Sequence, residues 1–264
     1  MTKRVWADEG PEPDSQPESD LEWDEVVDVI CVGTDPGPTA QAISGVRFDR
    51  RVLVVVRPRI WDTDTAAYIA EMTADLTPPE PGLRVPVTRA RPFEAKPVRG
   101  RVIDTFVGEH LRDWAGQCWA TPFGVLYTDP FGIDTAAMRA ADGLPIEAAV
   151  VGDYPAGAQR SGRALADWLA AQALEHDVQP DPDLTLQRLI IEYGRVAGAE
   201  LLSASRTLLV RAMNGVALPS RDRNTAAPDA DLAVGSHLTD VDLEVAIVGR
   251  PAGRFGRVEL LASG

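Results

Sequence analysis

One stretch near the start of the chain constrains the fold more than any other. Residues 26–32 form a largely apolar run, and a turn at Gly33 and a helix-compatible segment at 39–45 follow it. Such a run is typical of a strand that is buried on both faces, as in a parallel sheet. A second apolar run at 51–56 stops at Arg57-Pro58, and the interval between the runs just fits a crossover helix. The sequence therefore predicts a βαβ unit here.

The rest of the pattern predicts further helices and strands. Helical spacing of apolar residues indicates helices over 63–76, 104–119 and 161–177. Short strands are expected at 125–127 and 146–151, extended segments at 199–204 and 206–212, and a hairpin from 242–248 and 256–262. Residues 184–193 are apolar and compatible with either a helix or a strand. The predicted class is α/β, with antiparallel strands added late in the chain.

Composition divides the chain into a tail and one domain. Residues 1–22 are rich in Asp, Glu and Pro, which predicts a disordered acidic tail. The plainer interpretation is a solvated tail that aids solubility. The more specific one is a tail that docks on a basic partner. Residues 23–264 are expected to form a single domain, with a proline-rich excursion at 77–100 and a flexible loop at 219–236.

Charge and hydropathy exclude several classes of function. The net charge of −14 argues against binding of nucleic acid or of an anionic membrane surface. Apolar runs are far shorter than the roughly 20 residues of a membrane helix, and residues 1–20 carry no apolar leader segment, so a cytoplasmic location is expected. Cys31 and Cys118 are too few for a disulfide framework, and Cys31 is expected in the core.

The turn after the first strand is compared position by position with the dinucleotide-binding pattern G-x-G-x-x-G. Gly33 matches the first glycine. Asp35 stands at the second position, where a carboxylate obstructs and repels a pyrophosphate, and Pro38 stands at the third. Pro36 removes a further backbone N–H from the loop, while Gly37 lies beside the pattern and can compensate in part.

The strand and turn, the 161–177 helix and the segment Gly198-Ala199-Glu200-Leu201-Leu202-Ser203-Ala204-Ser205-Arg206 together resemble the glutathione-reductase-like FAD-binding fold, in its fumarate reductase and 3-ketosteroid dehydrogenase branch. The resemblance implies a Rossmann-like FAD/NAD(P)-binding-type parallel sheet. It also implies an acidic residue at the end of the second strand, which would hold the ribose. Arg57 stands there instead, the glycine-rich segment that follows in the family is absent, and the chain is short for a separate substrate domain.

Two functional hypotheses follow from this resemblance. The leading one is a non-catalytic, flavoprotein-derived accessory or interaction protein with a vacated dinucleotide site, no bound cofactor, and a protein partner or a second copy of itself. The alternative is an active oxidoreductase that holds FAD or NADP through a non-standard phosphate loop. Its cofactor-binding residues would be Gly33, Thr34, Gly37 and Arg57, with Arg57 accommodating a 2′-phosphate.

A third hypothesis is a small-molecule enzyme that uses loop carboxylates near two tyrosines. These are Asp129, Asp134, Asp142 and Asp153, with Tyr127 and Tyr154. Turn and cap roles are the plainer interpretation of the four aspartates. The aromatic run Trp114, Trp119, Phe123, Tyr127 and Phe131 indicates core packing or an exposed binding surface. His110, His176 and His237 are too far apart in sequence for a metal site, and none is predicted.

Overall fold

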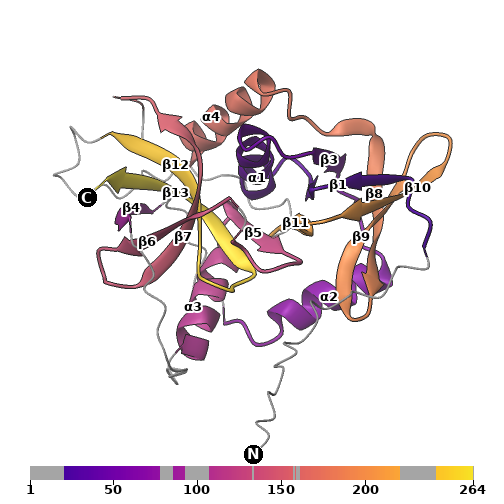
Figure 1. The fold of residues 1–264 in the computed structure, drawn as a ribbon, viewed down its shortest axis with the longest axis horizontal. Helices are drawn as coiled ribbons and strands as arrows, with labels where there is room; N and C mark the ends of the chain where they lie inside the picture. The colour runs from indigo at the N-terminus through magenta and orange to yellow at the C-terminus, as the bar shows by residue number, and fades with distance from the viewer. Residues whose placement is uncertain are drawn as a thin grey trace, which may run out of the picture.

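The computed structural model arranges most of the chain as one mixed sheet with helices on both faces (Figure 1). It describes residues 21–77, 86–92, 107–132, 134–156, 158, 161–220 and 242–263. Thirteen strands follow one another in the order β1-β10-β9-β8-β3-β2-β11-β5-β13-β12-β7-β6-β4.

Four parallel strands form the middle of this sheet. They are β8 (Asp181–Glu192), β3 (Val52–Val56), β2 (Val29–Val32) and β11 (Val216–Pro219). Helix α1 (Pro36–Arg47) connects β2 to β3, so the predicted βαβ unit is present. The apolar run 26–32 is divided, however, because Asp28 accepts a hydrogen bond from the Arg51 backbone N–H and separates β2 from a short strand β1 (Glu25–Val27).

One end of the sheet is a meander. Strand β8 turns into β9 (Arg195–Leu202) and then β10 (Thr207–Ala212), in antiparallel pairs, and β1 joins the outer edge parallel to β10. The ambiguous segment 184–193 is therefore strand. Its hydrophobic residues Leu186 and Leu189 are both buried in one core, and a register shift between Leu186 and Arg188 lets these positions, three apart, face the same side.

The other end of the sheet closes into a five-stranded barrel. Its strands pair in the order β13-β12-β7-β6-β4, and β4 pairs again with β13. They are β4 (Val87–Pro92), β6 (Ala136–Ala140), β7 (Pro145–Tyr154), β12 (Leu243–Gly249) and β13 (Phe255–Ser263). Strand β5 (Gly124–Tyr127) joins β13 to β11 and so connects the barrel to the parallel strands. The predicted C-terminal hairpin is the β12–β13 pair.

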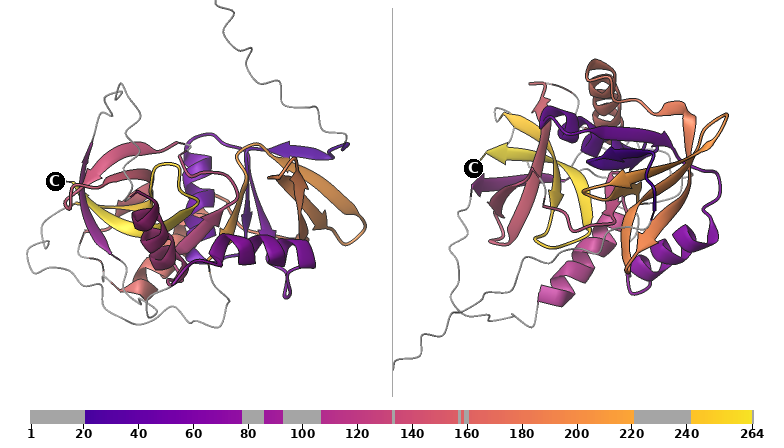
Figure 2. Two further views of the ribbon diagram at one scale, coloured as in Figure 1. Left: turned by 90° about the horizontal axis from the view of Figure 1, so that it is seen from below. Right: turned by 45° about the vertical axis from the view of Figure 1, so that its right-hand side comes forward.

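Helices cover the two faces of the sheet. Helix α1 packs with α4 (Gly162–Glu175) on one face, over a core that includes Ile43, Leu165 and Leu169. Helices α2 (Thr63–Thr73) and α3 (Val107–Trp119) lie on the opposite face, over a second core. Figure 2 shows the barrel at one end of the molecule and the meander at the other, from two further sides.

The expected fold class is wrong for the molecule as a whole. A Rossmann-like α/β sheet with a few added antiparallel strands was predicted, but the described residues are mostly β, and most strand pairs are antiparallel. The physical reason lies in the connection between β3 and its parallel neighbour β8. It is no simple helical crossover, because the chain builds α2, α3, α4 and barrel strands before it returns.

The described residues bear on several other predictions. Part of the excursion at 77–100 is strand β4, and most of the loop predicted at 219–236 lies outside the described residues, as do residues 1–20. Within the described part of the chain, no helix is long and apolar enough to span a membrane.

Candidate functional site

The first candidate site is the turn between β2 and α1, at the carboxyl ends of the parallel strands, where open α/β sheets bind ligands. Gly33 adopts φ +85°, a left-handed conformation that favours glycine. Its N–H donates to the carbonyl of Val55 in the neighbouring strand. Thr34 follows and is exposed to solvent. The tight turn that the sequence predicts is therefore formed.

The carboxylate of Asp35 and the guanidinium of Arg57 lie across this turn from each other. Asp35 is the N-cap residue of α1, but its side chain makes no capping hydrogen bond. Its Oδ2 lies 3.8 Å from Nη1 of Arg57, whose side chain is only 6% exposed. The Arg57 guanidinium also lies 5.2 Å from the ring centroid of Trp61, a cation–π contact. The side chain that stands at the expected ribose position is thus held by the protein itself.

The start of α1 is poor in N–H donors for an anion. Pro36 and Pro38 have no backbone N–H, and the Thr39 N–H donates to the carbonyl of Asp35. Gly37 packs against β5, since a Cβ at this position would lie 2.2 Å from the Gly124 carbonyl oxygen. Gly37 therefore permits close packing of helix on sheet, the role that the third glycine has in the family pattern.

Of the four predicted cofactor residues, the structure brings Gly33 and Arg57 together and places Asp35 between them and the helix start. A pyrophosphate at this place would meet a carboxylate and two prolines, where dinucleotide sites present glycines and N–H groups. A 2′-phosphate would compete with Asp35 and Trp61 for Arg57.

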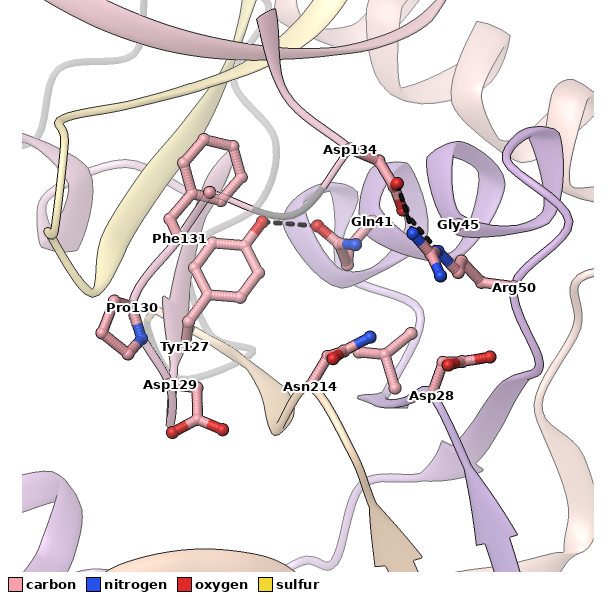
Figure 3. A pocket seen from close by; sticks show the side chains of 12 residues that line it. Asp28, Gln41, Gly45, Arg50, Tyr127, Asp129, Pro130, Phe131, Asp134 and Asn214 are labelled. Atoms are coloured by element: carbon pink, nitrogen blue, oxygen red, sulfur yellow. Dashed lines mark hydrogen bonds and ion pairs between the residues drawn. The ribbon is translucent and has the colours of Figure 1, made fainter. Parts of the chain in front are cut away.

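A second candidate site gathers some of the predicted loop carboxylates at the opposite ends of the same strands. Figure 3 shows Asp129 and Asp134 around a small cavity with Asp28, Asn214 and Tyr127. Asp134 accepts two hydrogen bonds from Arg50, at 2.7 and 2.6 Å. Asp129 is paired with Arg195, 3.1 Å away. The cavity holds about 30 Å³, which is room for a water molecule and little more.

Tyr127 is a buried side chain of that pocket. Its hydroxyl donates to Gln41 at 2.8 Å, and burial raises its pKa well above the ordinary value. Asp142 and Asp153 lie elsewhere: Asp142 accepts the Leu144 N–H in a turn, and Asp153 is on β7. The structure therefore unites two of the four predicted carboxylates, and both are occupied by arginines.

The remaining sequence candidates are mostly structural. Trp114, Phe123, Tyr127 and Phe131 are buried, so this run packs in the core. Cys31 and Cys118 are fully buried, and burial raises the pKa of both thiols. Among the described residues no three His, Cys, Asp or Glu side chains could hold a metal, and His237 lies outside them.

A third candidate site, which was not predicted from the sequence, is a cavity of about 270 Å³ between α3 and the mouth of the barrel. Three of the charged side chains that line it are Arg250, Arg257 and Glu259. The sequence of β13 did contain an indication of this cavity, because two charged residues occur on a strand face that is otherwise apolar. Residues 255, 257, 259 and 261 alternate with the apolar Val258, Leu260 and Ala262, so the two charges share the strand face of Phe255 and Leu261.

Comparisons with known proteins give only weak structural likeness. No protein-family model matches the chain, and no curated protein matches it. A solved 3-ketosteroid-Δ4-(5α)-dehydrogenase from Rhodococcus jostii RHA1 is 20% identical with a TM-score of 0.31, covering 75% of this chain and 46% of that one. A triple mutant of a flavin-dependent brominase is 15% identical with a TM-score of 0.27, covering 70% and 37%.

A third solved structure, a geranylgeranyl bacteriochlorophyll reductase-like protein from Thermoplasma acidophilum, is 13% identical with a TM-score of 0.28, covering 90% of this chain and 57% of that one. The chain thus spans less than two thirds of each neighbour. One of these names is a 3-ketosteroid dehydrogenase and one a flavin-dependent enzyme, which are kinds of protein that the sequence resemblance names. At these TM-scores the likeness carries no argument about cofactor or activity.

Proposed function

We propose that this chain is a flavoprotein-derived accessory or interaction protein that holds no dinucleotide at the β2–α1 turn and performs no redox chemistry there. One observation carries the proposal. The buried Arg57 guanidinium pairs with Asp35 and contacts Trp61, at the place where a dinucleotide-binding turn offers glycine backbone to phosphate and an acid to ribose.

Electrostatic repulsion and steric obstruction both oppose the binding of a pyrophosphate at this turn. An incoming pyrophosphate would have to displace the Asp35 carboxylate, which stays next to the helix start whatever its rotamer. Its phosphate oxygens would find two prolines in the first helical turn.

The surface of the meander half supports a role in protein contact. Exposed large apolar side chains occur along and beside β1, β8, β9 and β10, where a protein partner or a second copy could cover them. They are Leu21, Val26, Ile191, Tyr193, Leu202 and Met213.

Thermal unfolding with added FAD and with added NADP tests the proposal. A ligand at 100 times its Kd stabilises a protein by about 2.7 kcal/mol, which raises the melting temperature by several degrees in a chain of this size. We expect no rise with either ligand. A FAD- or NADP-dependent rise that Arg57→Gln abolishes would contradict the proposal. Arg188→Gln is the matched control, because it removes an exposed arginine of the meander.

A further inference from the structure

The cavity at the barrel mouth is built by all five barrel strands. Each contributes a residue to its lining, and α3 covers it from outside. Strands around a closed barrel point their outer side chains away from one another, so a cavity that all five strands share lies on the inner side of the barrel. One residue from each strand is Thr88, Ala140, Ile146, Val248 and Glu259.

The buried carboxylate of this cavity, Glu259, is already neutralised by Arg257. Glu259 is 1% exposed, and its Oε1 accepts a hydrogen bond from Arg257 Nε at 2.6 Å. Its Oε2 accepts from the hydroxyl of Thr88. With one charge of each sign in contact, Glu259 and Arg257 leave the cavity without a net charge of their own.

Arg250 adds a positive charge. Its guanidinium lies 4.6 Å from the ring centroid of Trp114 and donates one hydrogen bond, to the Pro145 carbonyl. Among the described residues, no carboxylate lies within ion-pair distance of it. A guanidinium has five N–H donors, so Arg250 keeps donors for a ligand at the cavity wall. Burial lowers the pKa of Arg250, and Asp142 and Glu259 oppose that shift through their charges.

The remaining wall combines polar side chains, among them Thr88, His110 and Gln117, with an apolar part. Leu144, Ile146, Val248 and the Trp114 indole border the same space. Asp113 and Asp142 also border it, and Asp142, which accepts the Leu144 N–H in a turn, acts on Arg250 through its charge. A small-molecule site needs apolar surface for the body of a ligand and polar groups that fix its orientation, and this cavity offers both.

We propose that the barrel-mouth cavity binds a small organic anion, with its carboxylate on Arg250 and its apolar body against Trp114, Ile146 and Val248. Carboxylate matches the flat, forked guanidinium with two parallel hydrogen bonds. The proposal is independent of the closed β2–α1 turn and does not rest on it.

Titration of the isotope-labelled full chain with benzoate tests this site by NMR. Benzoate should shift the Trp114 indole N–H and Arg250 Nε–H signals saturably, at concentrations up to about 10 mM, ten times a Kd of 1 mM. Benzamide, which has the same shape without the charge, should bind at least about tenfold more weakly. Failure of benzoate to move these two signals, or equal binding of benzamide, would overturn the proposal.

Variants assign the charge to one side chain. Arg250→Gln should weaken benzoate binding about 10- to 100-fold, because a charge-assisted hydrogen bond is lost. Arg188→Gln, on the distant meander, should leave it unchanged. Equal weakening by both variants would mean non-specific charge attraction and would overturn the site. If Arg250→Gln does not fold, the wild-type comparison of benzoate with benzamide still decides the matter.

Discussion

At the scale of single residues, the positions of the charged side chains explain the β2–α1 turn better than a comparison with the glycine motif does. Asp35 departs from the family pattern in sequence, but its effect depends on Arg57, which lies 22 positions later and is brought near by the β2–β3 register. The sequence alone shows that Asp35 and Arg57 each differ from the family pattern. Their contact was not predicted, because nothing local in either segment specifies that the two side chains face each other.

Glu147 gives a residue-scale prediction about pH. It lies on β7, and its Oε2 has no hydrogen-bond partner among the described residues. Burial raises the pKa of this carboxyl above 4.5, so the folded state binds its proton more tightly than the unfolded state does. Its contribution to stability is therefore best at low pH and is lost as pH rises through the folded-state pKa.

Glu147→Gln should accordingly stabilise the protein at pH 7. We expect a gain of up to about 0.5 kcal/mol, kept small because the side chain is partly open to solvent. The gain should vanish near pH 4. Urea unfolding of both proteins at the two pH values measures it. A variant that is less stable than the wild type at pH 7 would show that the charge is useful in the fold.

At the scale of elements, close packing of α1 on β5 fixes the helix against the sheet. The contact depends on Gly37, because the absence of a side chain there lets the helix approach the backbone carbonyl of Gly124 at the start of β5. The proline-rich start of α1 is compatible with this, because the first turn needs no N–H donors within the helix.

Gly37→Ala should therefore destabilise the protein, although alanine favours helices. The added Cβ would lie 2.2 Å from the Gly124 carbonyl oxygen, so helix or strand must move. Overpacking of this kind costs between about 1 and 3 kcal/mol. The urea midpoint should fall with an unchanged slope. Thr39→Ala, in the same helix and half-buried, is the control and should change stability by less than about 0.5 kcal/mol. Equal effects of the two variants would contradict the close contact.

Most individual helices and strands could be predicted from sequence, because hydrophobic periodicity is local. Helices at 63–73, 107–119 and 162–175 and the β12–β13 hairpin lie close to their expected ranges. The barrel could not be predicted. It depends on pairing between residues 87–90 and 260–263, which no local pattern specifies. The barrel-mouth cavity was missed for the same reason, since its lining comes from five strands and α3.

At the scale of the whole molecule, the two ends of the sheet have separate roles in this account. The parallel strands carry a βαβ unit, and its turn holds the Asp35–Arg57 ion pair. The barrel carries the cavity with unused guanidinium donors, and the meander carries exposed apolar side chains. A binding role therefore does not require a cofactor at the β2–α1 turn.

The flavin content of the purified protein tests the central claim most directly. The full chain would be incubated with excess FAD, passed through a desalting column, and denatured to release any bound flavin into the supernatant. We predict no visible flavin absorption in the folded protein and no FAD in the supernatant above the level of a protein without a flavin site. FAD recovered in amounts equal to the protein, and lost in Arg57→Gln, would contradict the account.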